Sequence, residues 1–140
     1  CNGTIKGITN KLDYIQGMGF EGIWLSPVLK NFYGPDPDGR SGYGAYGYWA
    51  YNWYEIDEHF GTAEDLKELS SELHKRGMVF IYDIVLNHCG PVHSMADVEQ
   101  IVPFNKPEYF HQRGIGNLTF DEYTQGFAYG GKGYPPPVQG

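Results

Sequence analysis

The 140-residue sequence has few cysteines and few basic residues, and it contains no long apolar run. None of its apolar stretches approaches the roughly 18 residues that a membrane-spanning helix needs, so we expect no membrane partner. Ten Lys and Arg against 17 Asp and Glu give a formal net charge of −7. This charge opposes binding to nucleic acid, because counterion release needs clustered basic side chains. A neutral partner fits the composition better.

The two cysteines, Cys1 and Cys89, leave the redox compartment open, since each can be free, paired with the other or paired outside this sequence. The N-terminus has neither a basic patch nor an apolar signal core, so we expect any signal peptide to have been removed. Acceptor sequons begin at Asn2 and Asn117, and such triplets are glycosylated in secreted proteins. These features predict a secreted, extracellular glycoprotein, although the triplets also arise by chance in cytosolic chains.

Several catalytic signatures are missing as well. The sequence has no GxxxxGK[ST] phosphate loop, no GxGxxG after a strand and no GxSxG turn, which removes the main support for nucleotide-dependent and serine-hydrolase functions. Its histidines form no zinc-binding HxxxH or HExxH pattern. The acidic residues near the middle match no metal loop, and we expect them to be mostly solvated. They are Asp36, Asp38, Glu55, Asp57 and Glu58.

The sequence does contain an ordered series of helix and strand patterns. Apolar residues over 5–18 recur at three- and four-residue steps between Thr4 and Gly19, which predicts one amphipathic helix. The short apolar run Gly22–Leu25 then predicts a strand buried on both faces.

A second helix and strand follow. Thr62 is placed to cap the second helix and Gly77 to end it. Its buried face is marked by Leu66, Leu69 and Leu73. The run Met78–Leu86 predicts a second buried strand. Buried strands joined through a helix imply a parallel α/β sheet with right-handed crossovers, either doubly wound or closed into a barrel.

Two irregular stretches rich in Gly, Pro and Tyr interrupt this order. From Lys30 to about Trp53 the sequence has no period of two or of 3.6, so we expect a long ordered loop, which in a compact domain is usually functional. After Cys89 the regular pattern ends, which predicts a small inserted subdomain or a disordered tail. A complete eightfold barrel needs roughly 250 residues, so a barrel also implies a fragment.

Polar residues follow the second predicted strand. Both parallel-sheet architectures bind ligands at the carboxyl ends of their strands, so Asp83, Asn87 and His88 are candidate site residues. The Asn87 amide oxygen suits calcium, and the His88 ring suits a sugar hydroxyl or a metal. The alternative is strand-end capping and a hydrogen-bonded buried histidine.

The segment from Tyr43 to Tyr51 alternates aromatic and small residues and includes Tyr48 and Trp49. Aromatic rings cover the C–H faces of pyranoses, while Tyr hydroxyls and the Trp N–H satisfy sugar hydroxyls. This segment therefore predicts part of a glucan groove. The alternative is a Tyr-rich loop that packs on its own domain.

Five ordered segments closely resemble fungal α-amylases: Lys11–Phe20, Gly22–Pro27, Gly47–Trp49, Phe60–Leu66 and Asp83–His88. The last one follows the first signature of that family, Asp-x-Val-x-Asn-His. The resemblance implies a partial (β/α)8 TIM barrel over residues 1–88, with Gly22–Pro27 as its second strand and Val79–Asn87 as its third. Residues 89–140 would begin an inserted domain B.

The resemblance also implies roles in substrate binding. Tyr48 would stack on the glucose at the cleavage subsite, Trp49 would line the same cleft, and His88 would hydrogen-bond that sugar. Asp83 would support the signature without acting as a catalytic acid.

For calcium, the resemblance implies that Asn87 ligates a structural ion between barrel and insert. Gln139 would stand where the family usually has an acidic ligand, which should weaken calcium binding. Cys1 would be half of a disulfide whose partner lies upstream. The match weakens after about Gly90, and the insert lacks the disulfide pair expected there.

The family hydrolyses α-1,4-glucosidic bonds in starch and related glucans with retention, through an Asp nucleophile, a Glu acid/base and a second Asp. These carboxylates belong on later strands, so we place no catalytic residue in this sequence and expect it to be inactive alone. The expected partners are starch and maltooligosaccharides, the cofactor is calcium, and the full-length parent is expected to be a monomer.

Three alternatives stay open. An α-glucanotransferase or α-glucosidase would share the barrel chemistry, and a non-catalytic glucan-binding homologue would need only the binding residues. A Rossmann-type domain has the weakest support, because its phosphate fingerprint is absent. We also expect the isolated segment to be unstable, since two paired strands leave exposed edges.

Overall fold

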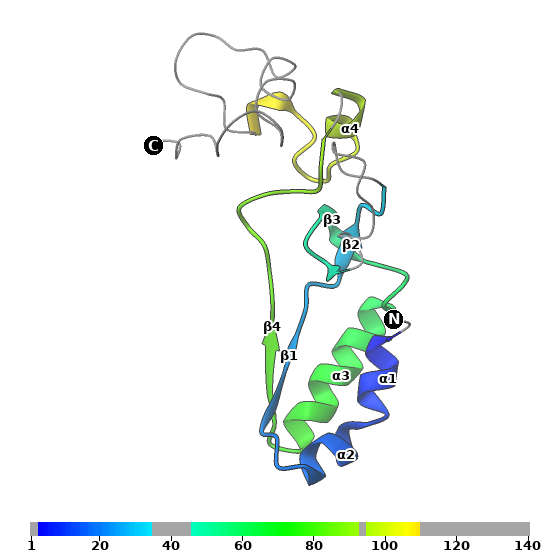
Figure 1. Ribbon diagram of the computed structural model, residues 1–140, viewed down its shortest axis with the longest axis vertical. Helices are drawn as coiled ribbons and strands as arrows, with labels where there is room; N and C mark the ends of the chain where they lie inside the picture. Colours follow the sequence, from blue (N-terminus) through cyan, green and yellow to red (C-terminus); the bar gives the residue numbers. More distant parts are fainter. Residues whose placement is uncertain (1–2, 35–45, 93–94, 110–140) are drawn as a thin grey trace.

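The computed structural model describes residues 3–34, 46–92 and 95–109 (Figure 1). Four residues with a predicted role lie outside these ranges: Cys1, Asn2, Asn117 and Gln139. Their disulfide, glycosylation and calcium roles stay predictions. In the described ranges, no helix combines the length and the apolar character that crossing a membrane requires.

The first predicted helix is wrong as one element, because the chain forms two short helices, α1 (Ile5–Thr9) and α2 (Leu12–Gly17). The Thr4 hydroxyl caps α1 by accepting from the Gly7 amide at 3.0 Å, as expected. The break falls after Thr9, whose hydroxyl donates to the Ile5 carbonyl at 3.2 Å. Thr and Asn are poor helix formers because their side chains compete for backbone groups, so the helix ends there although the apolar pattern continues.

The central unit consists of β1 (Gly22–Leu25), α3 (Ala63–Lys75) and β4 (Val79–Tyr82). The two strands pair in parallel, which confirms the predicted crossover through a helix. A capping box formed by Thr62 and Asp65 starts α3, also as expected.

The strand predicted over Met78–Leu86 is too long. The last bond of this ladder runs from the Asp83 amide to the Leu25 carbonyl at 3.0 Å. The neighbouring chain then reaches Pro27, which has no N–H to donate, so the ladder ends.

Helices α1, α2 and α3 cover one face of the parallel pair (Figure 1). Ile23 and Phe80 pack there against a buried cluster. The cluster consists of Ile5, Leu12, Val28, Leu69, Leu73 and Met78. The opposite face is also apolar but exposed, with Trp24 73% and Ile81 50% accessible, so the prediction of strands buried on both faces is wrong for the described residues. Apolar side chains on both faces are typical of parallel sheets that are covered on both sides.

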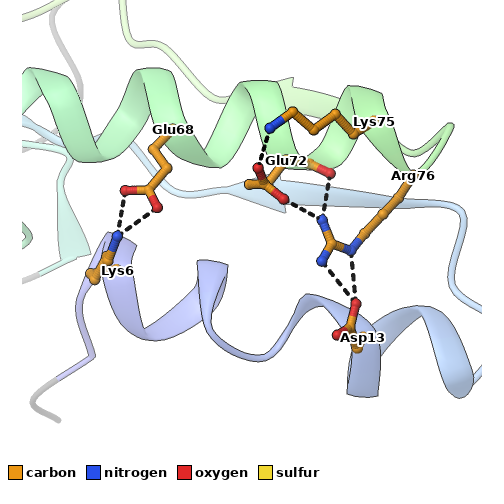
Figure 2. A network of polar contacts seen from close by, with 6 residues as sticks. All are labelled: Lys6, Asp13, Glu68, Glu72, Lys75 and Arg76. Atoms are coloured by element: carbon orange, nitrogen blue, oxygen red, sulfur yellow. Dashed lines mark hydrogen bonds and ion pairs between the residues drawn. The ribbon is translucent and has the colours of Figure 1, made fainter.

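Ion pairs tie the first two helices to α3 (Figure 2). Lys6 on α1 contacts Glu68, and the Arg76 guanidinium after α3 donates to the Asp13 carboxylate on α2 at 2.8 and 2.9 Å. Arg76 also donates to the Glu72 carboxylate at 2.7 Å. The network fixes both short helices along one side of α3.

The stretch from Lys30 to Trp53 is not all loop, contrary to expectation. It begins and ends in an antiparallel pair, β2 (Leu29–Asn31) and β3 (Ala50–Ile56). The register shifts on both sides of Lys30. These irregularities remove the strict alternation by which a strand is recognised.

The chain after β4 continues through α4 (Met95–Glu99) and a 3₁₀ turn, η2 (Pro107–Tyr109). Val102 contacts β3, since its carbonyl accepts from the Trp53 amide at 2.9 Å. This described part therefore packs on β3 and away from α1–α3 (Figure 1). The boundary predicted between residues 88 and 89 stays a prediction.

Candidate functional site

Three residues singled out in the sequence meet beyond the carboxyl end of β4. The Tyr48 hydroxyl donates to the Asp83 carboxylate at 3.0 Å. The His88 Nε2 lies 3.0 Å from the Tyr48 carbonyl oxygen. Because a carbonyl only accepts, Nε2 carries the proton in this contact, which leaves Nδ1 of a neutral ring as an acceptor.

Backbone bonds at the ends of the strands hold this group in place. The amide of Asp83 completes the ladder with β1, so its side chain leaves the sheet at the carboxyl end of β4. The Gly90 amide donates to the Ala50 carbonyl at 2.8 Å, which ties the loop after His88 to the start of β3. Two segments distant in sequence thus converge on one site.

The hydrogen bond to Asp83 also controls the protonation of Tyr48. It raises the pKa of the phenol above its ordinary value, with smaller contributions from partial burial and from the carboxylate charge. The hydroxyl therefore keeps its proton at neutral pH. The side chain stays 40% accessible and can still meet a ligand.

Gly47 shapes the approach to Tyr48. Its φ is +87°, in the left-handed region, and a Cβ there would lie 2.0 Å from the Pro27 carbonyl oxygen. Both the backbone conformation and the close approach require glycine.

Trp49 is hydrogen-bonded to the end of β2 and to the residue that follows it. Its amide donates to the Asn31 side-chain oxygen at 2.8 Å, and its carbonyl accepts from the Phe32 amide at 2.9 Å. Its ring lies 6.5 Å from the Phe32 ring and is half-buried. Although Trp49 follows Tyr48 directly in the sequence, its ring packs toward Phe32.

Asp57 is buried, contrary to the expectation that it is solvated, with 1% of its surface accessible. Its carboxylate accepts from the Asn31 amide at 2.9 Å, the His59 amide at 2.9 Å and the His59 ring Nδ1 at 2.7 Å. The Tyr33 hydroxyl donates to it as well. The next residue, Glu58, is also acidic but is exposed. The sequence pattern therefore does not distinguish the buried acid from the exposed one.

These contacts shift the pKa values of the partners in opposite directions. Burial by itself raises the pKa of Asp57, but the hydrogen bonds from Asn31, His59 and Tyr33 outweigh it and bring the pKa below its ordinary value. Burial and the nearby carboxylate raise the pKa of Tyr33 far above its usual range. Asp57 is therefore a charged group whose donors replace water.

Asn87 lies in the loop after β4 and is exposed, so its amide oxygen is accessible as a metal ligand. Calcium takes six to eight oxygen ligands. Within the ranges the structure describes, no cluster of three His, Cys, Asp or Glu side chains could hold a metal. An exposed amide oxygen is compatible with the calcium role expected of Asn87, which stays a prediction.

A cavity of about 260 Å³ is lined by the end of β2 at Asn31 and by Gly90 of the loop after β4. Phe32, Tyr33, Tyr51 and Gln100 are among its lining residues, and Tyr48, Asp83 and His88 are not. The polar group at the end of β4 is thus separate from this cavity.

Comparison with known proteins identifies the family. Residues 1–124 match the family model of the α-amylase catalytic domain. The chain belongs to the α-amylase family. The α-amylase of Saccharomycopsis fibuligera is 49% identical over 114 residues, which cover 79% of this chain and 22% of that protein. The resemblance to fungal α-amylases is therefore confirmed.

Solved structures of α-amylase family members support the fold. An α-amylase from Malbranchea cinnamomea matches with a TM-score of 0.68 at 45% identity, covering 80% of this chain and 23% of that one. A cyclomaltodextrin glucanotransferase matches with a TM-score of 0.59 at 39% identity, covering 65% and 19%. The fold is a partial TIM-barrel-like fold, and the chain spans about a fifth of the length of the curated relatives it matches.

Proposed function

We propose that this chain is part of the catalytic domain of an α-amylase that hydrolyses α-1,4-glucosidic bonds in starch, and that Tyr48, Asp83 and His88 form one wall of its substrate cleft. The observation that carries the proposal is that Tyr48 contacts both other residues beyond the end of β4: its hydroxyl donates to the Asp83 carboxylate, and its backbone carbonyl contacts the His88 ring. Barrels of this type place their active sites at the carboxyl ends of the strands. The family membership supplies the reaction class.

The wall binds and orients the sugar. The Tyr48 ring offers an accessible face on which a pyranose can stack. Its hydroxyl proton is engaged by Asp83, so its oxygen accepts from a sugar hydroxyl. In the tautomer that donates from Nε2 to the Tyr48 carbonyl, Nδ1 of His88 accepts in the same way. Trp49 lines the cleft behind Tyr48.

Asp83 is not the nucleophile in this proposal. Retaining glycosidases need two carboxyl groups about 5 Å apart, one as nucleophile and one as acid/base. The Asp83 carboxylate instead accepts a hydrogen bond from the Tyr48 hydroxyl. The nucleophile and the acid/base then come from other strands of the full-length domain, and purified residues 1–140 do not hydrolyse starch. Hydrolysis by that purified segment would show that the inactivity prediction is wrong.

We further propose that the parent enzyme is secreted and binds calcium through Asn87 and the segment around Gln139. Calcium would fix the loop after β4 by joining it to a second segment. Calorimetry on the full-length gene product tests this: Asn87→Ala should weaken calcium binding, and Gln139→Glu should strengthen it. Unaltered affinity in both variants would contradict the assignment.

Kinetics of the full-length gene product test the substrate wall. Tyr48→Leu and His88→Gln should each lower kcat/KM on maltooligosaccharides at least about tenfold, since each removes a contact to the sugar. Tyr54→Leu is the matched control, because Tyr54 is 75% accessible and lies on β3 outside the wall. If all three variants behave alike, the wall is misassigned.

The structural similarity to a cyclomaltodextrin glucanotransferase favours one second candidate, transfer of the glucan to a sugar acceptor instead of water. The same wall serves both reactions, because both cleave the same type of bond. Product analysis on soluble starch separates them. Linear maltooligosaccharides support hydrolysis, and cyclic or lengthened glucans support transfer.

A further inference from the structure

Two residues with polar side chains, Asn31 and Asp57, are buried in the described ranges, and a hydrogen bond joins them. Asn31 ends β2 and is 3% accessible, and Asp57 follows β3 and is 1% accessible. The backbone N–H of Asn31 donates to the Asp57 carboxylate at 2.9 Å, so Asp57 fixes the backbone from which the Asn31 side chain extends. Buried polar groups are costly unless they are hydrogen-bonded, so such a pair holds its geometry closely.

The Asn31 side chain forms two further hydrogen bonds, and one of them fixes the segment at Trp49. Its nitrogen donates to the Leu29 carbonyl on its own strand, which fixes which way the amide faces. Its oxygen then accepts from the Trp49 amide at 2.8 Å. The other face of the pair is closed by His59 and Tyr33, which donate to Asp57.

The Trp49 amide and the Tyr48 carbonyl belong to one peptide group, which is planar and rigid. Asn31 holds the N–H of this group, and His88 holds its C=O through Nε2 at 3.0 Å. Rotating the plane would break both contacts. The orientation of this one peptide thus determines where the His88 ring and the Tyr48 side chain lie.

We propose that Asn31, fixed by Asp57, is a positioning residue for the substrate wall: it orients the Tyr48–Trp49 peptide, and through it His88. This role rests on the proposed function of the wall. Asn31 itself is buried and does not touch the sugar. Its effect on catalysis passes through the hydrogen bond to Trp49.

The test uses the full-length gene product that carries this segment. Asn31→Ala removes the acceptor for Trp49 and should lower kcat/KM on maltooligosaccharides about tenfold, mainly by raising KM. Asn52→Ala is the matched control, because the Asn52 side chain accepts from the Tyr54 amide at 2.9 Å in the same hairpin, away from the wall. It should change kcat/KM by less than about twofold while losing a bond of the same kind.

A double-mutant cycle distinguishes positioning from general loss of stability. If Asn31 acts through the peptide that His88 contacts, Asn31→Ala should cost much less in a His88→Ala background, which lacks the donor to the Tyr48 carbonyl, than in the wild type. Equal costs in both backgrounds would overturn the positioning role.

Asn31→Asp keeps the proposal testable if Asn31→Ala does not accumulate as folded protein. A protonated Asp has one donor and one acceptor, like Asn, whereas an ionised one cannot donate to the Leu29 carbonyl and is repelled by its oxygen. Burial raises the pKa of a carboxyl group above its ordinary value of about 3.9, so the kcat/KM of Asn31→Asp relative to wild type should rise as the pH falls from about 7 to about 5. Tyr33 and His59, which donate to Asp57, stay unsubstituted in this experiment. A kcat/KM ratio of variant to wild type that does not change with pH would contradict the proposal.

Failure of this proposal is distinct from failure of the proposed function. If Tyr48→Leu and His88→Gln lower kcat/KM while Asn31→Ala behaves like Asn52→Ala, the wall stands and the positioning role is wrong. If the two wall variants have no effect, the proposed function fails, and the positioning role fails with it.

Discussion

The Tyr48 hydroxyl and the Asp83 carboxylate form a 3.0 Å hydrogen bond between segments 35 positions apart in the sequence. Tyr48 follows the turn at Gly47, and Asp83 follows β4. The bond thus joins the end of the parallel sheet to the segment that leads into β3. A resemblance to a family suggests that both residues matter, and the geometry adds that they act as a pair.

This pairing predicts non-additive effects of substitution. Tyr48→Phe keeps the ring but removes the donor, and Asp83→Ala removes the acceptor, so each should lower kcat/KM on maltooligosaccharides by a similar factor. The double variant should be no worse than either single variant, because the bond can be lost only once. Steady-state kinetics on the four proteins measure this. Multiplying effects would show that the two residues act independently.

Asp57 predicts an acid-dependent loss of stability. Its pKa is lower in the folded chain than in the unfolded chain, so the unfolded state binds more protons in acid. The stabilisation is fully present above the unfolded pKa of about 3.9 and is lost as the pH falls through the folded pKa. Asp57→Asn should therefore unfold at a lower temperature than wild type at neutral pH, and the gap should narrow below about pH 4.

Thermal unfolding followed by circular dichroism across this pH range measures the gap. Glu64→Gln is a suitable control, because Glu64 is exposed and its 3.8 Å contact with Lys67 is loose. It should shift the midpoint little at any pH. A gap for Asp57→Asn that does not vary with pH would assign the effect of Asp57 to packing instead of charge.

The ion pairs of Arg76 (Figure 2) predict that replacing Arg76 lowers thermal stability more than replacing another surface cation, Lys67. Arg76 contacts Asp13 and Glu72 at once and links α2 to the end of α3. Arg76→Gln should lower the thermal midpoint clearly, and part of this effect should vanish at about 1 M salt. Lys67→Gln should leave it unchanged within about 1 °C, because an isolated exposed pair contributes little. Equal shifts in the two variants would refute the network.

Local patterns in the sequence predicted the helix after Thr62 and the parallel pairing of β1 with β4, because both depend on capping residues and apolar periodicity. The same reasoning missed β2 and β3. Their bulged register hides the alternation, and nothing local shows which segment each one pairs with.

The residues of the candidate site also differ in whether local sequence could predict them. Asp83 and His88 could be predicted, because polar residues that end a buried strand stand out. The Asn31–Asp57 pair could not, because the burial of Asp57 arises from contacts between strands that are distant in sequence. Tertiary contacts also decide that the ring of Trp49 packs toward Phe32.

Gly47 gives the sharpest local prediction about the wall. A Cβ at this position would meet the Pro27 carbonyl at 2.0 Å, and the positive φ disfavours any side chain by roughly 1–2 kcal/mol. Gly47→Ala should therefore push the Tyr48 backbone away from β1 and lower kcat/KM even where the protein still folds. Gly17→Ala is the control, because Gly17 ends α2 with nothing within 4 Å of its Cβ position. It should be neutral or stabilising by up to about 1 kcal/mol. Kinetics and thermal unfolding of both variants test the argument, and full activity of Gly47→Ala would show that the wall does not depend on this turn.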